Sequence, residues 1–159
     1  MTPLPAAVEA VRLLRERGET IACAESLTGG LLCAALVDVP GASDVVVGGV
    51  VSYATWVKHS VLGVDGEHLA QRGAVDPGTA AQMADGVRRL LEADWGIATT
   101  GVAGPSPSEG KPAGTVFLGL DGPGHRLRSE PLHLDGDRDA VRRGTVGAAL
   151  SSLVATLCE

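Results

Sequence analysis

Aromatic residues are scarce in this chain of 159 residues, where they make up 3% of the sequence. Valine, leucine and alanine must therefore build most of the core. With 45% hydrophobic residues, the chain is long enough to form a single domain, residues 1–159, around such a core. A basic excess is also missing, because the net charge is −6. This charge argues against a broad nucleic-acid-binding surface but allows a small basic pocket for a phosphorylated ligand.

Long apolar runs are absent as well, and none reaches the length that spans a bilayer. Residues 1–5 lack the charged and apolar regions of a signal peptide, so we expect a cytoplasmic protein with no membrane partner. The three cysteines form no Cys-x-x-Cys pair, and we interpret Cys23 and Cys33 as small core residues. The histidines show no metal-ligand spacing, which predicts surface or loop positions and no metal site for His59, His68, His125 and His133.

Hydrophobic periodicity and turn residues divide the chain into alternating helices and strands. The predicted helices cover residues 5–17, 28–38, 66–72, 77–93 and 138–157, and a further short helical stretch follows Tyr53. The predicted strands cover residues 20–24, 45–53, 95–100, 115–120 and 126–134. A turn signal at residues 121–124 predicts that the last two strands form an antiparallel hairpin.

This order of elements predicts an α/β fold, namely a three-layer α/β/α sandwich with a mixed, mostly parallel sheet and a C-terminal antiparallel hairpin. Open α/β sheets bind their ligands at the carboxyl ends of the strands. Ser26, Tyr53 and the pair Thr100-Gly101 all follow predicted strands. The sequence therefore predicts that these residues meet in one crevice.

The stretch from Thr20 to Gly30 carries the strongest local signal. An apolar run ends in Glu25 and Ser26, and Gly29 and Gly30 then open a helical run. A serine delivered by a strand to the start of a helix lies beside unpaired backbone N–H groups and the positive end of the helix dipole. Such a serine suits a nucleophile or an anion site. Spacing alone leaves equally open that Ser26 or Thr28 only caps the helix.

The sequence offers Ser26 a lysine rather than a histidine as its base. No histidine lies at a predicted strand end, and the flanks of Ser26 do not form a Gly-x-Ser-x-Gly elbow. Lys58, five residues after Tyr53, is the leading candidate, and Lys111 in a polar loop is its rival. A lysine base must be neutral, which requires a pKa well below its ordinary value of about 10.4. Spacing alone also allows a solvated lysine at position 58.

Three arginines crowd the first turns of the last predicted helix, where the helix dipole disfavours cations: Arg138, Arg142 and Arg143. They are either solvated and paired with nearby aspartates, or they bind an anionic partner.

Seven motifs occur in a fixed order along the chain. They are Ala24-Glu25-Ser26-Leu27-Thr28-Gly29-Gly30, Gly49-Val50-Val51-Ser52-Tyr53 with Lys58, Leu62-Gly63-Val64, Gly73-Ala74-Val75, Thr100-Gly101-Val102-Ala103-Gly104-Pro105, Lys111-Pro112-Ala113-Gly114 and Gly136-Asp137-Arg138-Asp139-Ala140-Val141-Arg142. With these motifs, residues 5–157 closely resemble the CinA C-terminal domain family, the PncC-type nicotinamide-nucleotide amidohydrolases.

The resemblance implies hydrolysis of the carboxamide of nicotinamide mononucleotide to nicotinate mononucleotide and ammonia. It implies a serine nucleophile with lysine and tyrosine partners, which map onto Ser26, Lys58 and Tyr53. It further implies a homo-oligomer, no metal and no organic cofactor.

Ligand contacts are expected from residues around this set. We expect backbone N–H groups near residues 28–30 to stabilise an oxyanion. The arginines are expected to pair with the phosphate, and Glu25 to orient Lys58 or a ribose hydroxyl unless its role is structural. The expected contacts are Glu25, Thr28, Gly29, Gly30, Thr100, Gly101, Arg138 and Arg142.

The chain departs from the family pattern at residues 106–110. This segment replaces a glycine-rich stretch and is stiffer and one residue shorter. Asp76 also stands where serine is common, and either residue can cap a helix. Two other functions therefore stay open: an amidase for a different amide, and a non-catalytic nucleotide-binding or competence-related regulatory module.

Overall fold

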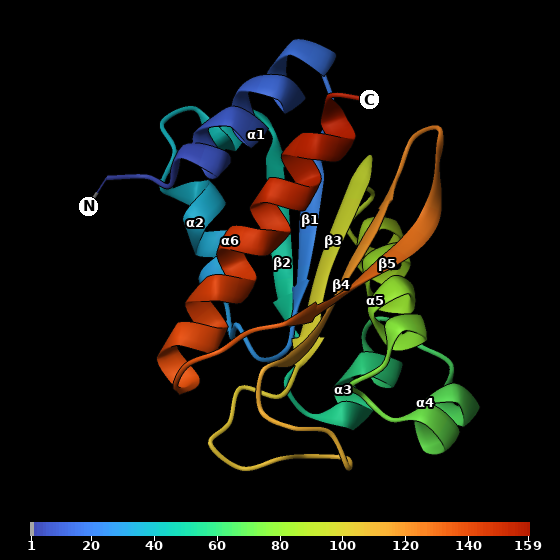
Figure 1. Ribbon diagram of the computed structural model, residues 1–159. Helices are drawn as coiled ribbons and strands as arrows, with labels where there is room; N and C mark the ends of the chain where they lie inside the picture. Colours follow the sequence, from blue (N-terminus) through green and yellow to red (C-terminus); the bar gives the residue numbers. More distant parts are fainter. Residues whose placement is uncertain (1) are drawn as a thin grey trace.

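The computed structural model describes residues 2–159 (Figure 1). The side chains of His125 and Arg126 lie outside its described part, and so does the predicted surface position of His125. The elements are α1 (Pro5–Arg17), β1 (Ile21–Glu25), α2 (Leu31–Val37), η1 (Ala42–Asp44), β2 (Val46–Val51), α3 (Thr55–Ser60), α4 (Gly66–Arg72), α5 (Pro77–Leu90), β3 (Trp95–Gly101), β4 (Thr115–Gly122), β5 (His125–His133) and α6 (Arg138–Leu157).

The five strands form one mixed sheet in the order β2-β1-β3-β4-β5. β1 pairs in parallel with β2 and β3, whereas β3–β4 and β4–β5 are antiparallel, so the predicted hairpin lies at one side of the sheet. Glu25 pairs with Val51 on one side and Thr99 on the other. This register brings the residues that follow β1, β2 and β3 to a common edge.

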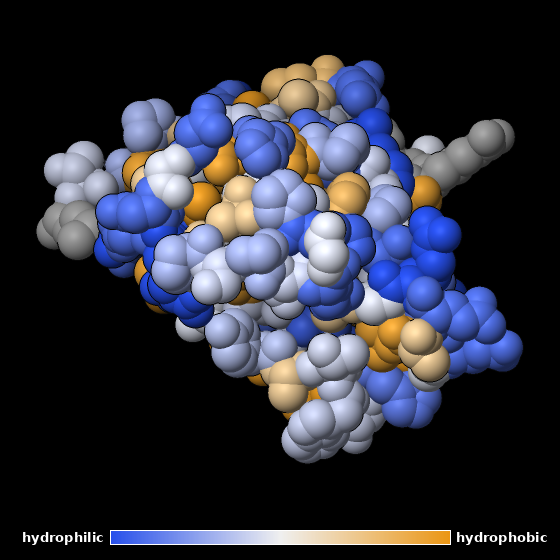
Figure 2. Space-filling model, turned by 60° about the horizontal axis from the view of Figure 1, so that its bottom comes forward, coloured by the Kyte–Doolittle hydropathy of each residue, from blue (hydrophilic) through white to orange (hydrophobic). Residues whose placement is uncertain are grey.

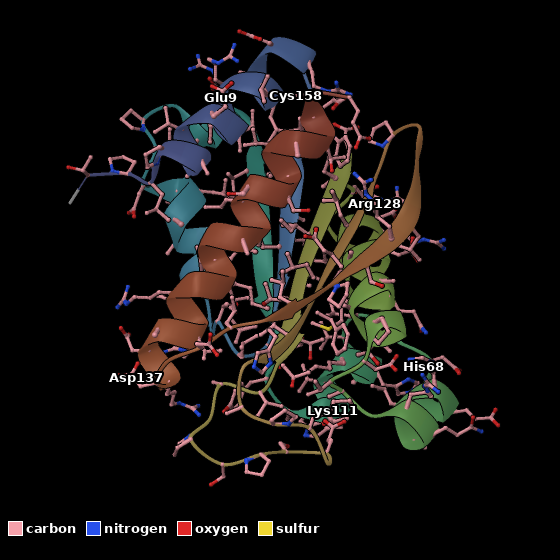
Figure 3. The ribbon with its side chains drawn as sticks, viewed as in Figure 1. Glu9, His68, Lys111, Arg128, Asp137 and Cys158 are labelled. Carbon is pink, nitrogen blue, oxygen red and sulfur yellow. The ribbon has the colours of Figure 1, made fainter. Side chains whose placement is uncertain are left out.

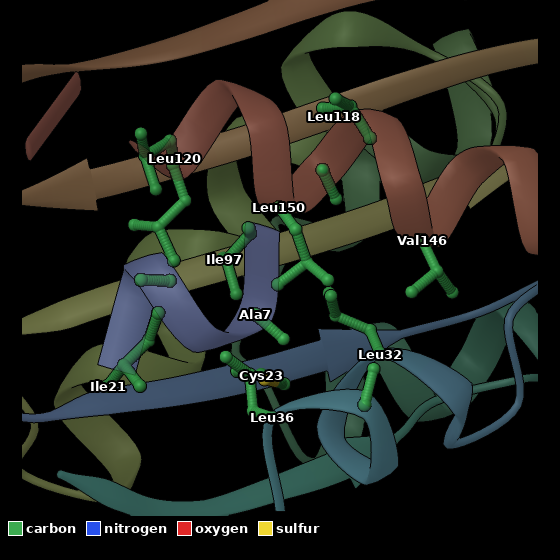
Figure 4. Close-up of a cluster of buried hydrophobic side chains, with 14 of the residues drawn as sticks. Ala7, Ile21, Cys23, Leu32, Leu36, Ile97, Leu118, Leu120, Val146 and Leu150 are labelled. Atoms are coloured by element: carbon green, nitrogen blue, oxygen red, sulfur yellow. The ribbon is translucent and has the colours of Figure 1, made fainter. Parts of the chain in front are cut away.

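Helices cover both faces of the sheet, which confirms the predicted three-layer architecture. α1, α2 and α6 lie on one face, and α5 lies on the other, with α3 and α4 near the carboxyl ends of the parallel strands (Figure 1). The larger core cluster fills the space under α1, α2 and α6 and includes Cys23, with Cys33 packed against it as predicted (Figure 4). The smaller cluster joins α5 to alanines of β1 and β3.

Two predicted helix boundaries move because of local backbone conformation. Helix α2 begins at Leu31 rather than at residue 28, because Gly29 and Gly30 adopt φ values of 58° and 106°, outside the helical region. Helix α5 ends at Leu90 rather than near residue 93, and Glu92 follows with a left-handed φ of 52°. Over residues 2–159, none of the helices combines the length and apolar character needed to cross a membrane.

Glycines in the sheet allow α5 to pack with its backbone against the strands. A Cβ atom on Gly119 of β4 would lie 2.0 Å from the Ala80 carbonyl oxygen, and one on Gly96 of β3 would lie 2.0 Å from that of Ala84. Neither carbonyl belongs to a flexible side chain that could turn aside. The position of α5 therefore depends on these two glycines.

We predict that Gly119→Ala lowers the free energy of unfolding by about 1–3 kcal/mol, because the added methyl group overpacks the α5–β4 contact. The matched control is Gly147→Ala in α6, where an added Cβ meets no atom within 4 Å. The control is expected to raise the free energy of unfolding by about 0.5–1 kcal/mol, since alanine favours the helix. Urea denaturation measures both, and equal midpoints for Gly119→Ala and wild type would contradict this account of the packing.

Candidate active site

Ser26 stands at the carboxyl end of β1, between β2 and β3 in the sheet. Its backbone N–H donates to the Thr99 carbonyl (3.1 Å), and its carbonyl accepts from Gly29 N–H (3.1 Å), which forms a tight turn before α2. The left-handed conformations of Gly29 and Gly30 make this turn possible. Ser26 is 7% exposed, so its hydroxyl lies just below the surface.

Glu25 caps α2, and this corrects the expectation that Glu25 contacts a ligand. Its buried carboxylate accepts hydrogen bonds from the backbone N–H groups of Gly30 (3.2 Å), Leu32 (2.8 Å) and Cys33 (2.9 Å). A carboxylate at this position satisfies the donors that a helix leaves unpaired at its first turn. Because Glu25 does this, the hydroxyl of Ser26 does not cap the helix.

The Thr28 hydroxyl does not cap the helix either. It is buried and lies 2.8 Å from the Thr99 hydroxyl. The hydrogen bond joins the serine turn to β3.

Lys58 is buried beside Ser26, so the solvated alternative for this lysine is wrong. The residue is 1% exposed, and its Nζ lies 2.9 Å from Ser26 Oγ, 2.6 Å from the Ser52 carbonyl oxygen and 3.2 Å from the Tyr53 carbonyl oxygen. Burial lowers the pKa of Lys58 to about 8, while the negative charge of Glu109 acts in the opposite direction. Lys111, the rival base, lies in the loop before β4 (Figure 3), and no hydrogen bond joins it to Ser26 within the described part of the chain.

The three oxygens around Nζ define how a neutral Lys58 is oriented. A neutral amine has two N–H bonds and one lone pair. The carbonyls of Ser52 and Tyr53 accept hydrogen bonds only, so they take the two N–H groups. The lone pair then faces the Ser26 hydroxyl. This is the arrangement that a general base requires.

The Tyr53 side chain lies away from this pair. The residue is 62% exposed and contacts Lys58 through its backbone carbonyl, whereas its phenol oxygen accepts from Arg138 Nη2 (3.2 Å). Arg138 Nη1 also donates to the Gly104 carbonyl (2.7 Å). The structure therefore brings the Tyr53 phenol together with Arg138, whereas the Tyr53 backbone carbonyl contacts Lys58.

A pocket of about 280 Å³ opens next to the serine turn. Its lining consists of Leu27, Tyr53, Gly101, Val102, Ala103, Gly104, Pro105, Ser106, Ser108 and Arg138. Figure 2 turns this end of the molecule forward, and its surface mixes hydrophilic and hydrophobic residues. A larger groove of about 600 Å³ lies between α6 and the β4–β5 hairpin, but none of the predicted site residues lines it.

The three arginines of α6 have different surroundings. Arg143 pairs with Asp139 at 2.9 Å, as the solvated alternative predicts. Arg142 braces the serine turn, because its Nε donates to the Leu27 carbonyl (2.8 Å) and its Nη2 to the Thr28 carbonyl (3.3 Å). Arg138 lines the pocket and, among the described residues, pairs with no carboxylate. Its charge is therefore available to an anion.

Three of the predicted contact residues, Thr100, Gly29 and Gly30, use their hydrogen-bonding groups within the protein itself. The Thr100 hydroxyl is buried and donates to the Ala74 carbonyl (2.8 Å), which holds the turn between α4 and α5. The N–H groups of Gly29 and Gly30 donate to Ser26 O and Glu25 Oε1. The N–H groups of Leu27 and Thr28, by contrast, meet no acceptor within residues 2–159.

Sequence reasoning missed Glu109 and the carbonyl of Ser52. The Glu109 carboxylate accepts from the backbone N–H groups of Ala74 and Val75, both at 3.3 Å. The unusual segment 106–110 was the only sequence signal that pointed to this glutamate, and no sequence pattern marks a backbone carbonyl. In the part of the chain that the structure describes, no group of three or more metal-ligating side chains is gathered.

The fold and the site define a three-layer α/β protein with a serine–lysine pair at the carboxyl edge of its sheet. A family model for the CinA C-terminal domain matches residues 4–157, and the chain belongs to this family.

Similar proteins agree with this assignment. A CinA-like protein of Frankia casuarinae is 55% identical over 138 residues, which cover 87% of this chain and 32% of that protein. A CinA-like protein of Synechocystis is 54% identical over 79% of this chain and 30% of its own length. The chain thus spans about a third of these curated relatives.

Solved structures match nearly the whole chain. A CinA superfamily protein from Klebsiella pneumoniae superimposes with a TM-score of 0.92 at 34% identity, covering 96% of both chains. The competence/damage inducible protein CihA from Agrobacterium tumefaciens reaches 0.89 at 34% identity, covering 100% of this chain and 99% of that one. The mixed sheet with helices on both faces is therefore the fold of this family.

We predict that Glu25→Gln lowers the free energy of unfolding by about 2–3 kcal/mol, because an amide nitrogen would face backbone donors that need an acceptor. The control is Glu67→Gln in the first turn of α4, where the glutamate is exposed and accepts only from the Gln71 side chain. This control should stay within about 0.5 kcal/mol of wild type. Urea denaturation measures the difference, and equal stabilities for the two variants would refute the capping role of Glu25.

Proposed function

We propose that this protein hydrolyses the carboxamide of nicotinamide mononucleotide, releasing nicotinate mononucleotide and ammonia. The observation that carries the proposal is the buried Lys58 amine, 2.9 Å from Ser26 Oγ and oriented by two carbonyls. The choice of substrate rests on the family motifs around these residues and on Arg138 in the adjacent pocket, which pairs with no carboxylate among the described residues. The proposal includes a homo-oligomer, as the resemblance implies, and a cytoplasmic location, as the sequence of residues 1–5 leads us to expect.

In the first half of the reaction, Ser26 Oγ attacks the carboxamide carbon while the neutral Lys58 amine takes the hydroxyl proton. The tetrahedral intermediate collapses with cleavage of the C–N bond, and the Lys58 ammonium returns the proton to the departing nitrogen. Ammonia leaves, and the nicotinoyl group remains as an ester on Ser26. In the second half, Lys58 takes a proton from water, the hydroxide attacks the ester, and Ser26 recovers its proton as the acid leaves.

The developing oxyanion needs hydrogen-bond donors that the protein does not already use. The N–H groups of Gly29 and Gly30 are occupied, so we assign this role to those of Leu27 and Thr28. Both follow the nucleophile directly, and Arg142 holds their carbonyls. The bracing by Arg142 supports a preorganised hole.

Arg138 is the proposed partner of the substrate phosphate. A guanidinium group binds phosphate through paired N–H donors, and this one is oriented by the Gly104 carbonyl and the Tyr53 phenol. In this proposal the Tyr53 phenol acts on Arg138, and its backbone carbonyl acts on Lys58.

The burial of Lys58 favours an enzyme over a non-catalytic binding module. Placing an amine in a site that lowers its pKa to about 8 destabilises the charged form and serves base catalysis, whereas a binding module needs no such group. An amidase with a different amide substrate would share Ser26 and Lys58 and differ in the pocket wall at residues 106–110.

We expect wild-type protein to release ammonia from nicotinamide mononucleotide, and Ser26→Ala and Lys58→Met each to reduce kcat by at least about a thousandfold, because each removes one half of the nucleophile–base pair. Ammonia release is measured with a coupled assay, and circular dichroism confirms that each variant is folded. Arg143→Met, which removes a surface ion pair only, is the matched control with wild-type activity.

Nicotinamide riboside, which lacks the phosphate, serves as the control substrate. Ammonia from neither compound with folded wild type would refute the amidase for this substrate class. Activity that survives Ser26→Ala would refute the covalent mechanism.

The activity should rise with pH, because only the neutral Lys58 amine accepts a proton from Ser26. The folded-state pKa of about 8 leaves roughly one amine in ten neutral at pH 7. We expect kcat/KM to increase about tenfold per pH unit below pH 8 and to level off above it. A profile measured from pH 6 to 9.5 that is flat or falls over pH 6–8 would rule out Lys58 as the base.

A further inference from the structure

Glu109 stands at the tip of the loop between β3 and β4, in an unfavourable backbone conformation. The tip is a tight turn closed by hydrogen bonds from Ser108 N–H to Lys111 O (3.0 Å) and from Lys111 N–H to Ser108 O (2.9 Å). Both central residues are left-handed, with φ values of 53° at Glu109 and 73° at Gly110. This conformation is ordinary for glycine but strained for glutamate. A hydrogen bond made by the Glu109 side chain would help to offset this strain.

The carboxylate of Glu109 provides that interaction. It accepts from Ala74 N–H through Oε2 and from Val75 N–H through Oε1, both at 3.3 Å, and so ties the loop to the turn between α4 and α5. Gly73 leaves the space for it, because a Cβ atom there would lie 1.8 Å from Glu109 Oε1. Thr100 holds the same turn from its other side through the Ala74 carbonyl. The loop tip is thus connected to the end of β3.

The negative charge of Glu109 also acts on Lys58, although no hydrogen bond joins the two side chains within the described residues. The groups around Lys58 Nζ are the Ser26 hydroxyl and the carbonyls of Ser52 and Tyr53, all uncharged. Among the described residues, Glu109 is the only charged group that acts on Lys58, and it favours the ammonium form. Three residues just before Glu109, namely Pro105, Ser106 and Ser108, supply part of the pocket wall.

We propose that Glu109 is a positioning residue that anchors the pocket-forming loop to the Gly73–Val75 turn, and that the anchored carboxylate adds its negative charge to the surroundings of Lys58. Its effect on catalysis rests on the proposed amidohydrolase function, whereas the anchoring does not. The anchor holds the substrate-facing wall in place. The charge favours the protonated Lys58 that delivers a proton to the leaving nitrogen.

The test compares Glu109→Gln with wild type and with Glu92→Gln, a matched control whose glutamate is also left-handed (φ 52°) but follows α5. The chain contains two lysines, Lys58 and Lys111, so NMR of ¹³Cε-labelled lysine resolves both titrations, and Lys111→Arg assigns them.

In Glu109→Gln the pKa of Lys58 should fall, since the negative charge that favours the Lys58 ammonium has been removed. Amide exchange at Ala74 and Val75 should become about tenfold faster.

Steady-state kinetics of Glu109→Gln test both the anchor and the charge. Glu109→Gln should raise KM for nicotinamide mononucleotide about tenfold with kcat within about threefold of wild type at the plateau, and should move the acidic limb of kcat/KM to lower pH. A residue with only a general structural role would not move that limb. Glu92→Gln should leave every readout unchanged.

The NMR readouts separate this inference from the proposed function. If wild type releases no ammonia but Glu109→Gln still shifts the Lys58 titration and speeds exchange at Ala74 and Val75, the substrate assignment fails and the anchor stands. An unchanged Lys58 titration together with unchanged amide exchange would overturn the inference.

Should Glu109→Gln not fold, Glu109→Asp keeps the charge but shortens the side chain, so that its carboxylate lies farther from the Ala74 and Val75 N–H groups. Faster exchange at Ala74 in that variant supports the anchor, and wild-type exchange overturns it.

Discussion

The burial of one amine is the constraint on which the carboxyl edge of the sheet depends. Lys58 is held under the surface by two carbonyls that follow β2 and by the hydroxyl that follows β1. In water this amine would be protonated at neutral pH, and burial brings its pKa to about 8. Lys58 and Ser26 can meet only because β1 and β2 are parallel neighbours that end at the same edge. The chemistry that we propose thus follows directly from the strand order.

Two glutamates support this edge, and both do so by accepting hydrogen bonds from backbone N–H groups. Glu25 organises the start of α2 beneath the nucleophile, and Glu109 connects the pocket loop to the turn before α5. A carboxylate used in this way fixes a main-chain conformation more firmly than a neutral acceptor, because charge-assisted hydrogen bonds are stronger. Leu27 of the serine turn, Ser106 and Ser108 of the loop, and Arg138 all line the pocket. Two segments of the site, the serine turn and the pocket loop, are therefore each fixed by hydrogen bonds from backbone N–H groups to a glutamate.

Membership of the CinA C-terminal domain family and the fold are shown by the family model and by solved relatives. The curated relatives are about three times as long as this chain, and the matched region covers about a third of each of them. The substrate is inferred from the site. Segment 106–110, where this chain departs from the family pattern, contains Glu109, whose carboxylate binds the Gly73–Val75 turn and whose charge acts on Lys58. Differences between relatives in this loop would therefore act on both the pocket wall and the base.

The sequence by itself determined the order of helices and strands, the hairpin, the position of Ser26 at a strand end and that of Lys58 in the short helix beyond the next strand, because periodicity and turn residues are local signals. It left open whether Ser26 caps a helix and whether Lys58 is solvated. Only the tertiary structure decided these points, since Glu25 takes the capping role and the segments that follow β1 and β2 both contact the amine. Glu109 and the free N–H groups of Leu27 and Thr28 were likewise out of reach of sequence reasoning. Their roles depend on which backbone groups elsewhere are already paired, and that is settled only when distant segments pack together.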